Sequence, residues 1–284
     1  MNLTTRNIML TLAYDGTAYH GWQVQPNGIT VQECVESALE QLTGIRQRIL
    51  CAGRTDSGVH ALGQVASFHT NVAIPAAQFR RGLQRFLPDD ITVICSQEVA
   101  PEFHATYSAV SKRYRYLIWD ASVMPPFLKN HVYRPRQSLQ IRAMQEALPV
   151  LLGTHDFRCF ETHYPNKATS VRTILDATIE RRPLPDLFNS AAGWQPDDAR
   201  PHEDPGRPLI CFEVEADGFL YNMVRAIVGT LLLIGNRPQP SDYLARVIRG
   251  QDRSSAGSTA PASGLCLMRV NYPDELLQVP TADE

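Results

Sequence analysis

The chain has 284 residues, of which 44% are hydrophobic, so it can bury one large core or two smaller ones. Its 20 prolines and 17 glycines are close to average usage, which argues against a largely disordered chain. The longest apolar stretch, residues 226–235, is too short to cross a bilayer, and the formal net charge of -2 does not by itself indicate a nucleic-acid partner.

The first half of the chain predicts strands and helices in alternation. Its first residues pass directly into a strand, without the charged, apolar and small-residue segments of a secretion signal, so we expect a cytoplasmic protein. The first helix begins at a capping box formed by Thr30 and Glu33 and ends at Gly44. The second helix has an apolar face over residues 79–87 and stops at Pro88. Strands are expected at residues 8–14, 49–54, 62–69 and 91–95.

The second half repeats this order of elements without repeating the sequence. A helix is expected at residues 141–151, although Pro149 conflicts with its last turn. The most apolar helix of the chain spans residues 219–234, and a short helix follows at residues 242–249. Strands are expected at residues 114–119, 171–180, 209–216 and 265–270.

Both halves therefore read as β-α-β-β-α-β, the ferredoxin-like order. We expect an α+β fold in which two such subdomains, residues 1–105 and 106–273, lie side by side with a central cleft that binds the substrate. Residues 274–284 form a tail. The segment 183–208 is rich in Pro, Asp and Gly and shows no period, so a solvated loop is expected there.

The six cysteines are scattered along the chain without a C-x-x-C pair. Small thiols within the core explain them better than a disulfide framework or a zinc site. His155, Cys159 and His163 are spaced four apart, but no fourth ligand is evident and Pro165 lies just beyond. No metal site is therefore expected.

Arginine dominates the basic residues, since only Lys112, Lys129 and Lys167 are lysines. The planar guanidinium suits phosphate and can stack on bases. A GC-rich coding bias would produce the same excess, so both explanations stay open. Candidate phosphate contacts, for which a solvated surface is the alternative, are Arg80, Arg81, Arg85, Lys112, Arg113 and Arg115.

The most informative segment is CAGRTDSGVH, residues 51–60. Asp56 and Ser57 favour a turn bonded by side chains, and Gly58 permits a positive φ angle, so a hairpin connection explains part of it. A hairpin alone does not explain Arg54 two residues before Asp56. The two side chains could pair at the mouth of the cleft and keep Asp56 ionised, although Arg and Asp also pair for structural reasons.

Two residues of the second half are candidates for the same site. Arg225 lies in an otherwise apolar helix, where a guanidinium is costly unless it is paired, so it should meet an anion. Tyr114 shares one face of a strand with Tyr116 and Ile118. Packing in the core is therefore the alternative explanation for Tyr114.

The segment AGRTDSGVHALGQVASF resembles the signature of the tRNA pseudouridine synthase A family. Ser57 is a small departure, because the bacterial pattern more often has Ala there. Further segments resemble blocks of that family in the same order, namely YDGTAYHGWQ, FHATYSAVSKRYRYLI, YNMVRAIVG and DRSSAGSTAPASGLCLMRVNYP. The resemblance runs from the first strand to the last and omits 183–208, the tail and much of 120–170.

The resemblance implies an enzyme that isomerises uridine to pseudouridine in tRNA, at positions 38, 39 and 40 of the anticodon stem-loop. It also implies a homodimer and no cofactor, and the chain has none of the glycine motifs that cradle nucleotide phosphates. Asp56 matches the family's nucleophile. The anion expected for Arg225 is then the Asp56 carboxylate. Tyr114 matches the active-site tyrosine, whose ring can stack on uracil and whose hydroxyl can take up the C5 proton.

Arg54 matches the residue that helps to flip the target uridine out of its stack. His60 is a further candidate for substrate binding. Buried hydrogen bonding and core packing are the alternatives for His60, and also for Trp22 and Gln23, which lie in a family-like block as well. Two rival functions stay open at this point. One is a non-catalytic RNA-binding protein with the same fold, and the other is a ferredoxin-like enzyme acting on free nucleotides.

Overall fold

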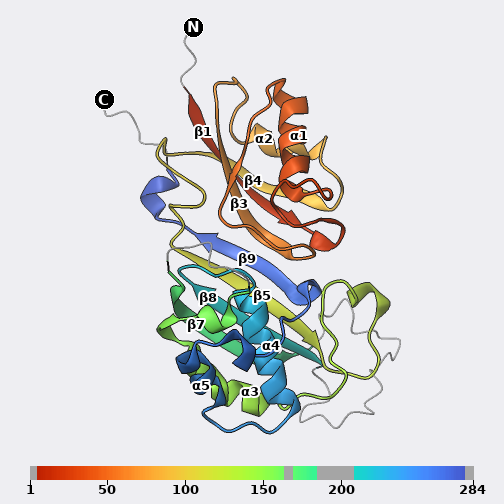
Figure 1. Ribbon diagram of the computed structural model, residues 1–284. Helices are drawn as coiled ribbons and strands as arrows, with labels where there is room; N and C mark the ends of the chain where they lie inside the picture. The colour runs from red at the N-terminus through yellow and green to blue at the C-terminus, as the bar shows by residue number, and fades with distance from the viewer. Residues whose placement is uncertain (1–4, 163–168, 184–207, 279–284) are drawn as a thin grey trace. The chain divides into compact units, whose positions relative to one another are not determined.

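The structure is a computed structural model that describes residues 5–162, 169–183 and 208–278 (Figure 1). The chain divides into two compact units. Unit 1 comprises Met1–Lys112 and Cys266–Glu284, and unit 2 comprises Arg113–Leu265. His163, most of the expected loop at 183–208 and the end of the tail lie outside the described residues.

Unit 1 has the strand order of a ferredoxin-like sheet. Its strands are β1 (Arg6–Tyr14), β2 (Leu50–Cys51), β3 (His60–Thr70), β4 (Ile91–Val99) and β9 (Leu265–Asn271). β1 lies between β4 and β3, β2 pairs with β3, and all three pairings are antiparallel. The last strand, expected in the second subdomain, falls from Cys266 onward in unit 1, where it runs parallel to β3.

The helices of unit 1, α1 (Val31–Thr43) and α2 (Gln78–Gln84), pack against each other (Figure 1). α1 begins and ends as expected: the Thr30 side chain accepts a hydrogen bond from the Glu33 amide, and Gly44 closes the helix at a φ of 72°. α2 is shorter than expected. It ends in a tight turn at Gln84, well before Pro88, and the Gln84 side chain bonds to β4 instead.

Unit 2 contains β5 (Ser111–Trp119) from Arg113 onward, β8 (Leu209–Ala216), β7 (Val171–Arg182) and β6 (Gly153–Asp156), which follow one another as neighbouring strands. β7 is antiparallel to both β8 and β6. The sequence did not predict β6, because four residues are too few to show alternation. The strands expected at residues 114–119, 171–180 and 209–216 are confirmed, with small differences at their ends.

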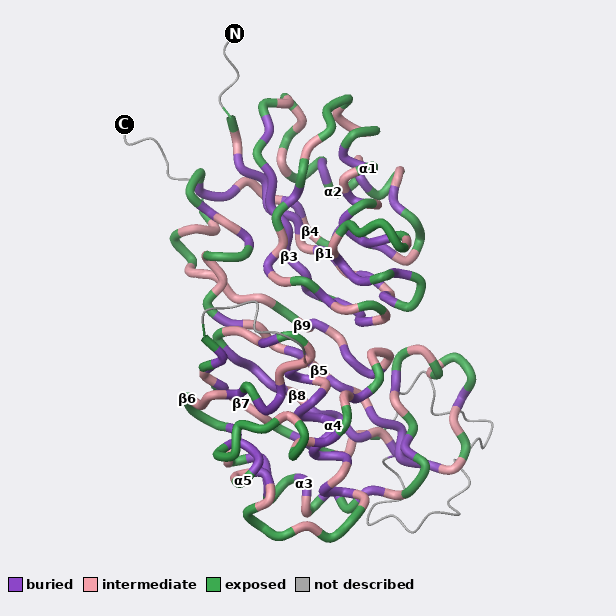
Figure 2. The backbone as a smooth tube through the Cα atoms, viewed as in Figure 1, coloured by how far each residue is buried: buried purple, intermediate pink, exposed green. Residues whose placement is uncertain are grey.

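The helices of unit 2 are α3 (Ile141–Ala147), α4 (Met223–Asn236) and α5 (Tyr243–Gly250). α3 packs against α4 and β7. The conflict at Pro149 is resolved because the α-helix ends at Ala147 and continues as a 3-10 helix over Leu148–Leu151. α4 starts four residues later than expected, after Asn222 at a φ of 61°, and is almost entirely buried (Figure 2).

The described residues thus form an α+β fold whose strand pairings are mostly antiparallel. All six cysteines are free, and Cys159 and Cys211 are buried. Within the described part of the chain, none of the helices combines the length and the hydropathy that a membrane span requires.

Candidate active site

The Asp56 side chain lies on the connection between β2 and β3 in unit 1. The Val59 amide donates to the Asp56 carbonyl over 3.1 Å, and Gly58 takes a φ of 78°, so the hairpin turn expected from the sequence is present. Asp56 is half-buried, whereas Arg54 and Ser57 are exposed. The turn therefore presents a carboxylate and a guanidinium at the surface of unit 1.

Buried polar groups form hydrogen bonds with residues of this turn. The Tyr14 hydroxyl and Thr55 Oγ1 are 2.8 Å apart, and Gln64 Nε2 donates to the Gly53 carbonyl over 2.8 Å. Burial raises the pKa of Tyr14, although the hydrogen bonds from Thr55 and Gln64 lower it in part. The phenol is therefore neutral at physiological pH and acts as a fixed hydrogen-bonding group beneath the turn.

Two glycines of the first family-like block allow the backbone to approach the turn. The Trp22 amide donates to the Thr55 carbonyl over 3.0 Å. A Cβ on Gly16 would lie 2.1 Å from the Val59 carbonyl oxygen, and one on Gly21 would lie 2.6 Å from that of Thr55. Gly21 also has a φ of 85°, which L side chains rarely adopt. Neither glycine stands out in the sequence, although both lie in the block YDGTAYHGWQ.

His60 is buried at the start of β3, with 7% of its surface exposed. Its Nδ1 lies 3.1 Å from the Gly16 amide and 3.1 Å from Asp15 Oδ1. One ring nitrogen cannot accept from the amide and donate to the carboxylate at once, so these two bonds belong to different protonation states. Either bond links the end of the turn to residues 15–16.

Cys51 and Lys112 flank the start of the connection. Burial raises the pKa of the Cys51 thiol to about 11, although the charges of Lys112 and Arg54 lower it in part. Cys51 is therefore a neutral thiol, which is a poor nucleophile. Lys112 Nζ donates to the Ala52 carbonyl over 2.7 Å, which brings an ammonium group to the beginning of the turn.

Tyr114 and Arg225 both belong to unit 2. The Tyr114 ring is 8% exposed and meets the Phe219 ring edge-to-face, with centroids 5.1 Å apart. Arg225 Nε donates to the Ala260 carbonyl over 2.7 Å, and Nη1 donates to Asn222 Oδ1 over 2.9 Å. These bonds hold the Arg225 guanidinium at the first turn of α4, close to the segment that carries Phe219.

The structure thus brings the sequence-predicted residues together in two local groups. Arg54, Asp56 and His60 lie on one connection of unit 1, and Tyr114 and Arg225 lie near the start of α4 in unit 2. The meeting of Asp56 with Tyr114 and Arg225 stays a prediction from the sequence.

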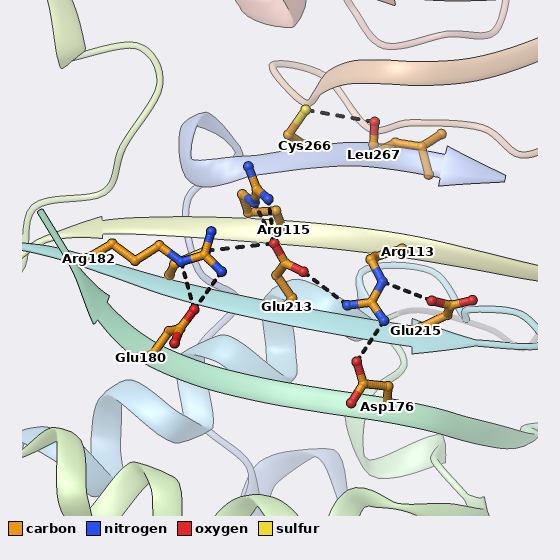
Figure 3. A network of polar contacts seen from close by, with 10 residues as sticks. Arg113, Arg115, Asp176, Glu180, Arg182, Glu213, Glu215, Cys266 and Leu267 are labelled. Carbon is orange, nitrogen blue, oxygen red and sulfur yellow. Dashed lines mark hydrogen bonds and ion pairs between the residues drawn. The ribbon is translucent and has the colours of Figure 1, made fainter. Parts of the chain in front are cut away.

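Two candidate phosphate contacts, Arg113 and Arg115, are held instead by carboxylates on the sheet of unit 2 (Figure 3). Arg113 donates to Asp176, Glu213 and Glu215 over 2.6, 3.0 and 2.8 Å. Arg115 also binds Glu213, which is therefore shared by two guanidinium groups. The sequence could not reveal this, because the acidic partners come from β7 and β8. Three further candidates, Arg80, Arg81 and Arg85, are exposed.

We expect Glu213→Gln to lower the free energy of unfolding at neutral pH by about 1 kcal/mol. Burial favours a higher pKa for Glu213, but the hydrogen bonds and charges of Arg115 and Arg113 outweigh it, so the pKa lies below its ordinary value of 4.5. Its contribution is therefore complete above pH 4.5 and is lost as the pH falls through the lowered pKa. Denaturant unfolding at a series of pH values measures this difference, which should shrink in acid.

Glu180→Gln is the matched control, because Glu180 is 53% exposed and pairs with Arg182 at the surface. We expect it to change stability little at any pH. Equal changes in the free energy of unfolding for the two substitutions would show that binding two arginines does not increase the contribution of Glu213 to stability.

No metal is expected at His155, Cys159 and His163, and the structure describes the first two of these residues. His155 Nε2 bonds to the Leu152 carbonyl over 2.9 Å, and Cys159 is fully buried with a pKa raised by burial to about 12. Both side chains are therefore engaged in local structure.

Comparisons with known proteins bear on the whole chain. A family model described as tRNA pseudouridine synthase matches residues 11–108 and 147–273. The tRNA pseudouridine synthase A of Acetivibrio thermocellus is 45% identical over 267 residues, which cover 94% of this chain and 100% of that protein. The protein of the same name from Thermoanaerobacter sp. strain X514 is 41% identical, with the same coverage.

Among solved structures, a chain from the crystal structure of a Cbf5-Nop10-Gar1 complex is 12% identical. The matched region covers 95% of the present chain and 52% of the chain from that complex, with a TM-score of 0.33. A similarity this low carries no argument about function.

Proposed function

The chain belongs to the tRNA pseudouridine synthase A family and isomerises uridine to pseudouridine in tRNA, and we propose that it modifies positions 38, 39 and 40 of the anticodon stem-loop with Asp56 as the nucleophile. The observation that carries this proposal is the Asp56 turn. Asp56 is the only acidic residue between 51 and 60. It lies on a turn whose Thr55 side chain bonds to Tyr14 and whose backbone contacts Gly21 and Gln64.

The proposed reaction breaks the N1–C1′ glycosidic bond, rotates the uracil and joins C5 to C1′. The proton on C5 then leaves and N1 gains one, so atoms and electrons balance without an oxidant or a second substrate. An ionised Asp56 can attack C1′ or remove a sugar proton, and both roles require a carboxylate that is held in place. The supported turn meets this requirement, because a half-buried side chain on a fixed backbone has few alternative positions.

The other site residues have complementary proposed roles. Tyr114 stacks on the uracil and takes up the C5 proton, which is compatible with a ring already fixed by Phe219. Arg225 pairs with the Asp56 carboxylate and keeps it ionised. Arg54, exposed beside Asp56, fills the space of the flipped uridine and holds its phosphate. His60 contributes by holding the end of the turn.

A homodimer in the cytoplasm, with one tRNA touching both subunits, completes the proposal. It is supported by the family resemblance and by the tRNA substrate. Light scattering of the purified protein tests the dimer, because a monomer at micromolar concentration would contradict it.

The proposed function predicts pseudouridine at positions 38–40 when the pure protein is mixed with unmodified tRNA and no cofactor. Chemical mapping of the product measures the modified sites. Binding should weaken steeply as the salt concentration rises, because phosphate contacts release counterions. Binding without modification would favour the non-catalytic RNA-binding protein. Turnover of a free nucleoside without salt dependence would favour the metabolic enzyme.

A further inference from the structure

An aromatic side chain in unit 1 is almost fully exposed. Tyr107 is 84% exposed, more than any other large apolar side chain in the described residues. It stands in the loop 103–110, which leads from the end of β4 into β5. Single exposed aromatic residues are common, so exposure alone does not define a site.

Four local hydrogen bonds hold the backbone around Tyr107. His104 Nδ1 accepts from the amides of Thr106 and Tyr107 over 3.1 and 3.3 Å. The Ser108 amide donates to the His104 carbonyl over 2.9 Å, and Ser108 Oγ accepts from the His104 amide over 3.0 Å. These four bonds close a compact turn, which holds the Tyr107 side chain in a defined direction.

The Tyr107 ring stacks on the imidazole of His104. The ring centroids are 4.4 Å apart, and the planes are tilted by 34°. One face of the phenol is thus supported by a second ring, and the exposure of 84% leaves the opposite face to solvent. The result is a preformed flat surface, which binds at a lower entropy cost than a mobile side chain.

The loop that carries Tyr107 is also hydrogen-bonded to the start of the connection that carries Asp56. Thr106 Oγ1 donates to the Cys51 carbonyl over 2.6 Å, and the Tyr272 hydroxyl donates to the Ala105 carbonyl over 2.6 Å. The next carbonyl after Cys51, that of Ala52, accepts from Lys112 Nζ. The loop that carries Tyr107 is therefore bonded to the segment that leads into Arg54 and Asp56, and Lys112 bonds to the same segment.

We propose that Tyr107 stacks on an unpaired nucleobase of the tRNA, separate from the uridine that is isomerised. The proposal rests on the tRNA substrate of the proposed function. Bases inside a duplex have both faces covered, so the open face of the ring selects a base in a single-stranded part of the RNA. Neighbouring Lys112 and Arg54 favour a phosphate-bearing ligand over a protein partner.

We expect Tyr107→Ala to raise the Kd for tRNA by about 5- to 100-fold. Stacking involves no counterion release, so this factor should be the same at every salt concentration, with an unchanged salt slope. KM should rise while kcat at saturating tRNA stays near wild type, because the loss affects binding rather than the reacting atoms. Filter binding and single-site kinetics measure these quantities.

Tyr107→Phe retains the ring and should bind tRNA like wild type. Ile94→Ala removes another exposed apolar side chain of unit 1, 44% exposed on β4, and should have no effect. Thermal melting checks that all variants are folded. Equal affinity of Tyr107→Ala and wild type, with wild type active on tRNA, would overturn the stacking proposal alone. An inactive wild type would instead contradict the proposed function.

Tyr107→Trp provides a direct spectroscopic readout. A stacked base quenches indole fluorescence, and the described tryptophans, Trp22 and Trp119, are buried with 1% and 0% exposure. An anticodon stem-loop should quench the additional fluorescence relative to wild type, whereas a fully paired RNA of the same length should not. Quenching by both RNAs alike, or by neither, would contradict a base-stacking surface.

Discussion

Asp56→Asn should abolish pseudouridine formation, with a loss of at least about a thousandfold in kcat. The substitution keeps the shape of the side chain but removes the charge that either proposed chemical role requires. The turn itself should persist, since the substitution keeps the Asp56 carbonyl, which accepts the hydrogen bond from the Val59 amide. Chemical mapping of pseudouridine in tRNA, under single-turnover conditions, measures the loss.

Ser57→Ala is the matched control for this variant. Ser57 is exposed, and its hydroxyl makes a 3.2 Å bond to the Tyr19 carbonyl at the edge of the same turn. Activity close to wild type is expected, because the substitution keeps the Asp56 carboxylate and removes a hydroxyl at the edge of the turn. Both variants should bind tRNA and melt like wild type. Near-normal activity of Asp56→Asn would exclude Asp56 as the nucleophile.

Gly21→Ala should lower kcat about 100-fold even though residue 21 touches no substrate atom in the proposed mechanism. An added Cβ would lie 2.6 Å from the Thr55 carbonyl oxygen and 3.1 Å from the Asp56 carbonyl carbon. Because these are backbone atoms, the turn must move, and with it the carboxylate. We also expect a loss of about 2 kcal/mol in the free energy of unfolding, since Ala is strained at a φ of 85°.

Gly44→Ala separates the two causes. Gly44 has a similar φ of 72°, but no atom lies within 4 Å of its added Cβ. It should therefore lose about 1 kcal/mol of stability and keep wild-type kcat. Steady-state kinetics and denaturant unfolding of both variants measure the difference. If the two variants had the same kcat, close contact of Gly21 with the Asp56 turn would not matter for catalysis.

Local patterns in the sequence predicted much of the fold. The capping box at Thr30 and the left-handed Gly44 were sufficient to place α1, because both signals act within one turn of helix. Alternation located β1 and β8 because their alternating apolar residues are buried, although much of the opposite face is buried as well. The predictions were less accurate for elements that depend on packing. The strand β6 was not predicted, and the predicted bounds of α2 and α4 differ from the observed ones.

The candidate site divides in the same way. The segment around Arg54, Asp56 and Gly58 stood out because a hairpin explains Asp56 and Gly58 but not Arg54, and because the segment resembles a family signature. Gly16 and Gly21 did not, since their importance lies in contacts with residues more than thirty positions away. Arg113 and Arg115 stood out in the sequence as candidate phosphate contacts. In the structure their side chains bind carboxylates on β7 and β8 instead.

By itself, the sequence determined the α+β class, the family resemblance and the turn that carries Asp56, because each depends on neighbouring residues or on ordered motifs. Only the tertiary structure decided which glycines press against that turn, which arginines are engaged by carboxylates, and that β9 pairs with β3. The physical reason is that these features are contacts between distant segments. Such contacts follow from how the sheets and helices pack, which a local pattern of residues does not specify.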